Sequence, residues 1–256
     1  MTCAEGKQAK TFQPCKDSGG NAPIDVVGGI ICSDLKGLIT PMDRKRNRYL
    51  VNFVDHKSNY VRIFVAKTKR EAAKKLEHFM VFFERQFNVC VHILRTDGGG
   101  EYHNVDLFCQ HTGIGRQVMD PNSSASNGKA GRMHRNVMNM LRYMLFGYVL
   151  CINFWGYAAE YAAYVLNRMP TRANVGRKLP LEILTGKNVS RIDVVVFGSP
   201  CKVYRAPTNK STGKRSSAGT IIGKTEETKV PSVSTSVSNR YYETSRQSDR
   251  NSDAGG

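Results

Sequence analysis

Residues 69–97 read KREAAKKLEHFMVFFERQFNVCVHILRTD, and this stretch decides the fold. Its first part spaces apolar residues three and four apart, which predicts a helix with Leu76 and Phe83 on the inner face and a basic outer face. Residues 89–94 are an uninterrupted apolar run that leads to Asp97, a pattern typical of a buried strand. A strand that follows a helix in this way is expected to be parallel to the preceding strand and central in the sheet.

The flanking sequence extends this pattern in both directions. Upstream, apolar runs at 26–32, 49–54 and 60–65 are separated by short polar or basic turns, which predicts an antiparallel meander of three strands. Downstream, apolar residues at helical spacing predict helices over 129–146 and 154–168. The order of elements indicates an α/β fold with a mixed sheet.

Composition points to a polyanionic partner. The 256 residues include 38 Lys and Arg against 21 Asp and Glu, which gives a net charge of +17. Such a charge favours nucleic acid over a membrane surface and disfavours enzymes of acidic small molecules, so no small-molecule substrate is expected. Hydrophobic residues make up 40% of the chain, which excludes wholesale disorder.

Targeting features predict an intracellular protein. The residues after Met1 form no apolar leader, and the seven cysteines are scattered rather than spaced as a disulfide framework. Residues 143–159 carry no charge, but they are too few and too often interrupted by glycine and asparagine for a transmembrane span. We therefore expect no membrane association.

Two carboxylates, Asp34 and Asp97, stand at or near the ends of apolar strands. Neighbouring strands lie about 4.8 Å apart, so two aspartates on adjacent strands could share a divalent cation. The alternative is that each caps a turn, above all Asp97 before the glycines at 98–100. The two residues alone leave both interpretations open.

Seven motifs in sequence order resemble the integrase core of Copia-type LTR retrotransposons. They lie at 32–37, 49–55, 94–102, 127–133, 154–155, 166–171 and 196–198. The resemblance implies an RNase H-like fold, with a mixed five-stranded sheet flanked by helices, and phosphoryl transfer with Mg²⁺ or Mn²⁺ held by two Asp and one Glu. It assigns the first two ligands to Asp34 and Asp97. It also implies DNA partners (element ends and target), a homo-oligomer and a nuclear site of action.

The third ligand is where this sequence departs from the family. The motif Asn-Gly, two residues, Glu, Arg reads here as residues 127–132, with Gly131 at the position of the Glu. Glu101 and Asp120 are the nearby acidic residues that could replace it, but neither lies on the helix that would aim it at the pair. The chain is therefore expected to be a catalytically impaired polynucleotidyl transferase. The alternative is a non-enzymatic, basic nucleic-acid-binding protein derived from an integrase.

Further departures indicate a degenerate fragment and set the expected domains. Residues 1–26 are a remnant of a zinc module and linker, and because Cys3 alone resembles a ligand of that module, no zinc site is expected. The catalytic core spans 27–190, a basic extension 191–228, and a disordered Ser-rich tail 229–256. His134, one turn after Gly131, reaches the site or packs at the surface of the helix; we favour packing.

Nucleic-acid contact depends on distributed charge and survives the loss of a catalytic residue. The cations expected to make it are Lys129, Arg132, Arg135 and Arg142 on the long helix and Arg44, Lys45 and Arg46 in a basic turn.

Overall fold

The computed structural model describes residues 22–97, 103–119, 128–189, 194–204, 216–228 and 235–243. The main sheet is built from β1 (Ile30–Lys36), β2 (Tyr49–Asp55), β3 (Val61–Ala66), β4 (Ile93–Asp97) and β5 (Gly115–Met119). The helices are α1 (Lys69–Phe87), α2 (His103–Thr112), α3 (Gly128–Gly147), α4 (Trp155–Leu166) and α5 (Pro180–Thr185), with short 3-10 turns at Ile152–Phe154 and Val175–Arg177. A second sheet contains β6 (Pro200–Tyr204), β7 (Ser216–Thr228) and β8 (Thr235–Glu243).

The main sheet is mixed, as the sequence predicts. Its strands lie in the order β3-β2-β1-β4-β5. β1, β2 and β3 pair antiparallel and form the predicted meander, while β4 pairs parallel with both β1 and β5. The strand after the first helix is therefore parallel to its neighbours and lies inside the sheet.

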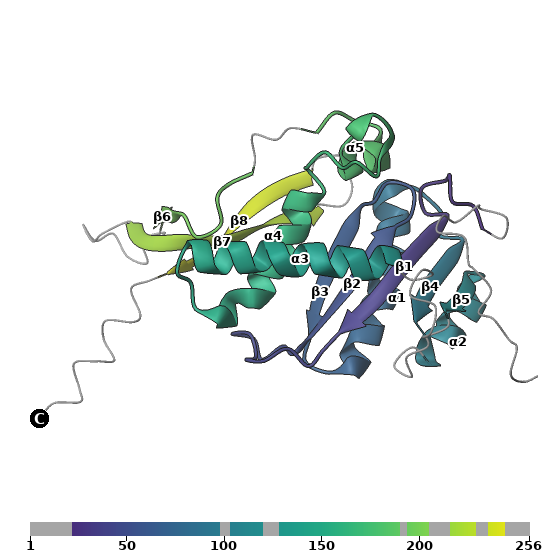
Figure 1. The fold of residues 1–256 in the computed structure, drawn as a ribbon, viewed down its shortest axis with the longest axis horizontal. Helices are drawn as coiled ribbons and strands as arrows, with labels where there is room; N and C mark the ends of the chain where they lie inside the picture. The colour runs from purple at the N-terminus through teal and green to yellow at the C-terminus, as the bar shows by residue number, and fades with distance from the viewer. Residues whose placement is uncertain are drawn as a thin grey trace, which may run out of the picture.

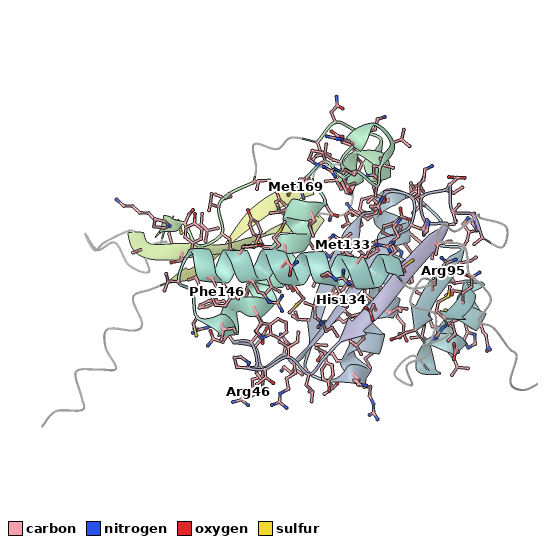
Figure 2. The ribbon with its side chains drawn as sticks, viewed as in Figure 1. Arg46, Arg95, Met133, His134, Phe146 and Met169 are labelled. Atoms are coloured by element: carbon pink, nitrogen blue, oxygen red, sulfur yellow. The ribbon has the colours of Figure 1, made fainter. Side chains whose placement is uncertain are left out.

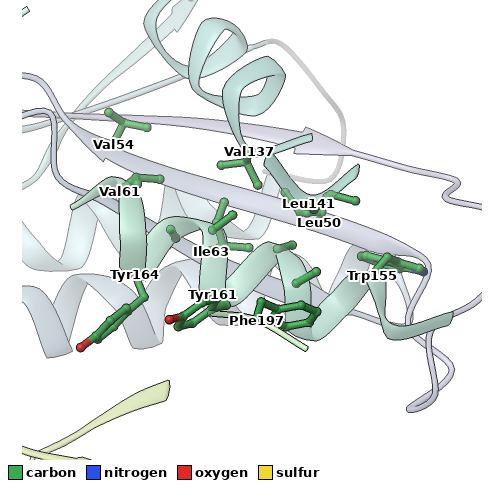
Figure 3. Packing of buried hydrophobic residues seen from close by; sticks show 14 of the residues in the cluster. Leu50, Val54, Val61, Ile63, Val137, Leu141, Trp155, Tyr161, Tyr164 and Phe197 are labelled. Carbon is green, nitrogen blue, oxygen red and sulfur yellow. The ribbon is translucent and has the colours of Figure 1, made fainter. Parts of the chain in front are cut away.

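Helices cover both faces of the main sheet (Figure 1). On one face Phe79 of α1 stacks on Phe53 of β2 with ring centroids 4.6 Å apart. On the other face Val137 and Leu141 of α3 pack over Leu50 of β2 (Figure 3). Because side chains alternate along a strand, each interior strand contributes residues to both apolar clusters, and this explains why consecutive residues of β1 and β2 are apolar.

The outer edge of β3 is capped by a side chain. Asn167, just after α4, accepts a hydrogen bond from the amide of Val61 and donates one to its carbonyl, both at 2.8 Å. Asn167 is buried, and its own carbonyl accepts a hydrogen bond from the amide of Leu181 at the start of α5. One of the motifs that resembles the family is thus structural, since it ties α4 and α5 to the edge of the sheet.

The second sheet packs beside α4, where Ile222 of β7 joins the apolar cluster of that face. Its strands pair antiparallel in the order β6-β7-β8. β8 lies inside the stretch 229–256 that was predicted as a disordered Ser-rich tail, and there Thr235–Glu243 pair with β7 as a strand. The physical reason is that Val237, Tyr241 and Tyr242 favour a strand, and β7 offers them an edge to pair with.

Several elements were not predicted from periodicity: α2, β5 and α5 beside the main sheet, and β6, β7 and β8 of the second sheet. β5 is an edge strand with little burial, so it lacks the apolar run by which a strand is recognised. The strand expected at 89–94 begins only at Ile93, because residues 89–92 connect α1 to the sheet. No helix among the described residues is long and apolar enough to cross a bilayer.

Candidate active site and cationic face

Asp34 and Asp97 occupy equivalent positions on adjacent parallel strands. The last paired residues of β1 and β4 are Cys32 and Arg95, and each aspartate lies two residues further along its strand. Cys32 and Ile93 belong to the apolar cluster beneath α3 and α4, so alternation directs both aspartates to that same face. The register therefore brings the two predicted ligands to one end of the sheet, on the side that α3 covers.

Gly131 lies in the first turns of α3 and faces Asp34. A Cβ atom built on Gly131 would lie 4.0 Å from Oδ2 of Asp34, an ordinary van der Waals distance, and outside its own helix it meets no other heavy atom of the described residues within that radius. A longer side chain at position 131 would thus start beside the Asp34 carboxylate without a clash at its first atom. Glycine leaves this space without a ligand.

His134 approaches the same carboxylate from the next turn of α3. Its Nδ1 lies 2.9 Å from Oδ2 of Asp34, and its side chain is 5% exposed against 26% for Asp34. Its Nε2 is buried and has no hydrogen-bond partner among the described residues. Packing was the favoured interpretation of His134 in the sequence; the residue is buried as expected, but it also contacts the site. His134 follows Gly131 by three residues, about one helical turn, and this spacing indicated the contact in the sequence. Figure 2 shows His134 on α3.

Asn52 fixes the distance between α3 and the strand that carries Asp34. It lies opposite Asp34 in the β1–β2 register and is fully buried. Its Nδ2 donates to the carbonyl of Ala130 at 2.8 Å, and its Oδ1 accepts from the amide of Asp34 at 3.1 Å. This bracket holds position 131 next to Asp34. Sequence reasoning missed it, although a polar residue inside the apolar run of β2 was a visible signal.

Lys129 turns inward instead of toward solvent. Its ammonium group donates to the carbonyl of His56, and burial lowers its pKa below the usual lysine value. The nearby Cys32 and Asp55 oppose this shift, whereas Arg132 and Arg95 add to it through like charge. Lys129 is therefore less accessible to a DNA phosphate than its position on α3 led us to expect.

Arg95 adds a buried cation on the strand that carries Asp97. It is 7% exposed, and its guanidinium donates to Oε1 of Gln117 on β5 through Nε at 3.2 Å and Nη2 at 3.0 Å. The sequence analysis did not single out Arg95. Its position two residues before Asp97 places it on the same face of the sheet and gives this end of the strands a positive as well as a negative component.

The remaining predicted cations lie at the surface. Arg132, Arg135 and Arg142 are exposed on the outer side of α3, where Arg142 donates to Oδ1 of Asn139 at 3.2 Å. In the basic turn between β1 and β2, Arg44 lies 4.8 Å above the ring of Phe154 and Lys45 5.1 Å above that of Tyr157. These stacking contacts orient the turn while its charged ends stay in solvent; Arg46 is also exposed.

The metal ligands present do not complete the set that the resemblance implies. Among the described residues no three His, Cys, Asp or Glu side chains gather as they would around an ion. Asp34 and Asp97 supply two carboxylates, Gly131 supplies none, and one oxygen of Asp34 is already contacted by His134. This donor set does not fit a pair of hard divalent cations that needs carboxylates from three positions. Glu101 and Asp120, like Cys3 and Cys15, lie outside the described residues.

Comparison of the sequence identifies relatives in plant transposons. The chain is 31% identical over 205 residues to the retrovirus-related Pol polyprotein from transposon TNT 1-94 of Nicotiana tabacum, a match that covers 79% of this chain and 15% of that protein. It is 28% identical over 163 residues to the corresponding protein from transposon RE2 of Arabidopsis thaliana, covering 64% of this chain and 11% of that one. The chain thus spans well under a fifth of the relatives it matches. No protein-family model matches it.

Comparison of the structure identifies the fold. A chain of the cryoEM structure of the simian T-cell lymphotropic virus intasome in complex with PP2A regulatory subunit B56 gamma superposes with a TM-score of 0.51 at 14% identity, over 86% of this chain and 77% of that one. The HTLV-2 integrase catalytic core domain in complex with magnesium gives a TM-score of 0.47 at 17% identity, over 62% and 97% of the two chains.

Proposed function

We propose, from its relatedness to retrovirus-related Pol polyproteins of plant transposons and its RNase H-like integrase-core fold, that this chain is an integrase core that binds DNA but is impaired in strand transfer. The observation that supports the impairment is the vacant ligand position at Gly131, beside the Asp34 carboxylate. In this family the third carboxylate shares the metal ions that activate the attacking oxygen and stabilise the leaving one. A glycine offers no oxygen for that purpose.

What this chain's own residues would still do is hold DNA and keep the site formed. Arg132 and Arg135 lie on the exposed side of α3, near the end of the helix that faces Asp34, and they would contact DNA phosphates there. Asn52 would keep position 131 beside that carboxylate, and His134 would hold the carboxylate in place. Binding of this kind depends on salt and not on sequence.

The first experiment measures strand transfer and end nicking on labelled DNA with Mg²⁺ or Mn²⁺. The native chain is compared with Gly131→Glu and with the double variant Gly131→Glu/Asp97→Asn. Gly131→Gln is the matched control, because it fills the same space without a charge. We expect activity in Gly131→Glu alone, because the Cβ of the added glutamate would lie 4.0 Å from Oδ2 of Asp34 and its carboxylate would complete the set of three.

The remaining outcomes distinguish the alternatives. Activity in the native chain that is lost with Asp97→Asn would contradict the impairment and assign the third ligand to another carboxylate. If no variant is active but the chain binds duplex DNA with an affinity that falls steeply with salt, the non-enzymatic binding protein is the better description. Absence of both activity and binding would refute the proposal as a whole.

A further inference from the structure

The outer side of α3 carries a stripe that the proposed reaction does not use. The inward residues of the helix are buried: Ala130, His134, Val137, Leu141 and Leu145. On the opposite side Arg142 follows Arg135 after two helical turns, Phe146 follows Arg142 after about one, and Tyr143 lies beside Arg142; all four are exposed. Below, these four residues are called the arginine–aromatic stripe.

The two rings of the stripe are exposed to an extent that the fold does not explain. Tyr143 is 80% exposed and Phe146 is 69% exposed, although both lie within a regular helix. Burying large apolar side chains stabilises a fold, so two exposed rings one helical turn apart forgo a substantial part of the stability they could supply. Phe146 and His134 lie at opposite parts of α3 (Figure 2), which separates these rings from the candidate active site.

The charge of the helix indicates what covers this stripe. The 20 residues of α3 contain no aspartate or glutamate, and the chain as a whole carries +17. A second copy of the chain would bring like charge against Arg135 and Arg142, so self-association through this face is disfavoured. A polyanion with flat apolar surfaces complements both features, because its charges meet the arginines and its flat surfaces meet the rings.

We propose that the arginine–aromatic stripe binds single-stranded DNA, with phosphates on Arg135 and Arg142 and unpaired bases stacked on Tyr143 and Phe146. Stacking on aromatic side chains beside a cationic track is a general way of holding unpaired strands. A duplex offers its phosphates but keeps its bases stacked inside, so it would leave both rings uncovered. The choice of DNA over RNA rests on the proposed function.

The dimensions of the stripe suit a short segment of strand. From Arg135 to Phe146 the helix rises about 16 Å, long enough to contact a few nucleotides of an unpaired strand. Arg142 uses one nitrogen for Asn139, and a guanidinium has further N–H donors that point elsewhere. Both arginines therefore keep donors for phosphate oxygens.

The test compares the affinity of the native chain for oligo(dT), for an abasic strand of equal length and for a duplex. The abasic strand has the same phosphates and no bases. We expect oligo(dT) to bind about tenfold more tightly than the abasic strand, because each stacked base contributes to affinity. Tyr143→Ala/Phe146→Ala should abolish this preference while duplex binding stays the same, since alanine preserves the helix.

Two control variants separate stacking from charge and from general surface changes. Leu107→Ala removes a side chain on α2 that is 59% exposed, and it should keep the preference for oligo(dT). Arg142→Gln should weaken oligo(dT) and the abasic strand in parallel. The aromatic double variant is also tested for duplex binding and, combined with Gly131→Glu, for strand transfer. If both are retained, the proposed function stands even if this inference fails.

Several results would overturn the inference. Equal affinity of the native chain for oligo(dT) and the abasic strand would remove the role of the rings, as would an unchanged preference in the double variant. Tighter binding of oligo(U) RNA than of oligo(dT) would assign the stripe to RNA. If the double variant instead lost self-association in sedimentation, or lost binding to phosphatidylserine vesicles, with oligo(dT) binding intact, the occupant would be a second copy or a membrane.

Discussion

Replacing Asn52 with alanine should destabilise the chain, because it leaves two buried backbone groups without partners. The carbonyl of Ala130 loses the donor at 2.8 Å, and the amide of Asp34 loses the acceptor at 3.1 Å. Asn52 itself is fully buried, so water cannot readily replace it. An unsatisfied buried group costs about 1–3 kcal/mol, and the expected loss in the free energy of unfolding for the two groups is therefore about 2–6 kcal/mol.

This loss is large enough to measure by urea unfolding followed through the fluorescence of Trp155. Trp155 is the single tryptophan of the chain; it is buried, and its indole N–H donates to the carbonyl of Pro41 at 2.9 Å. At about 2–4 °C per kcal/mol for a chain of this size, the melting temperature should fall by about 4–24 °C.

Two further variants make the Asn52 prediction specific. Asn52→Asp keeps an acceptor for the Asp34 amide but loses the donor to Ala130, so it should also destabilise the chain. Asn139→Ala removes an exposed asparagine from the same helix and should change stability by no more than about 0.5 kcal/mol. A loss below about 1 kcal/mol for Asn52→Ala would refute the idea that this bracket holds α3 against β1.

Two other predictions concern stability. Burial raises the pKa of Asp55 above its usual 3.8, although hydrogen bonds from Ser58 and Gly28 oppose this shift. The contribution of this carboxyl group to folding stability is therefore fully present below pH 3.8, and it is lost as the pH rises through the raised pKa. The stability of the native chain relative to Asp55→Asn, measured by urea titration, should therefore fall across that window, and a flat or rising difference would contradict the assignment. Asn167→Ala should lower the free energy of unfolding by about 2–4 kcal/mol and speed hydrogen exchange at the amide of Val61. Unchanged protection of that amide would argue against the edge cap.

The sequence predicted the elements that bury many apolar residues at regular spacing. The three strands of the meander, α1, α3 and α4 all have such patterns, and the mixed sheet is confirmed. β5 and β8 escaped because they are edge strands, whose residues need not alternate strictly or be apolar. For β8 the abundance of serine outweighed the pair Tyr241 and Tyr242 in the prediction.

In the candidate site, the sequence could predict only the positions of residues at strand ends or at fixed spacings within a motif. The β1–β4 register brings Asp34 and Asp97 to one end of the sheet, and the Gly131 position faces Asp34; their role as metal ligands stays a prediction. The roles of Asn52 and Lys129 could not be predicted, because each depends on a contact with a backbone carbonyl far away in sequence. The spacing of residues along a helix cannot show whether a lysine such as Lys129 extends into solvent or folds against a neighbouring loop.

The contact between His134 and Asp34 has a consequence for how the chain folds. Where three carboxylates cluster, their mutual repulsion disfavours the compact state until a cation arrives, so folding and ion supply are coupled. Among the described residues this chain brings two carboxylates to that end of the sheet, and an imidazole nitrogen meets one of them at 2.9 Å. A glycine at position 131, where the resemblance implies a glutamate, therefore adds no third negative charge here, and we expect the unfolding midpoint of the chain to change little when divalent ions are removed with a chelator.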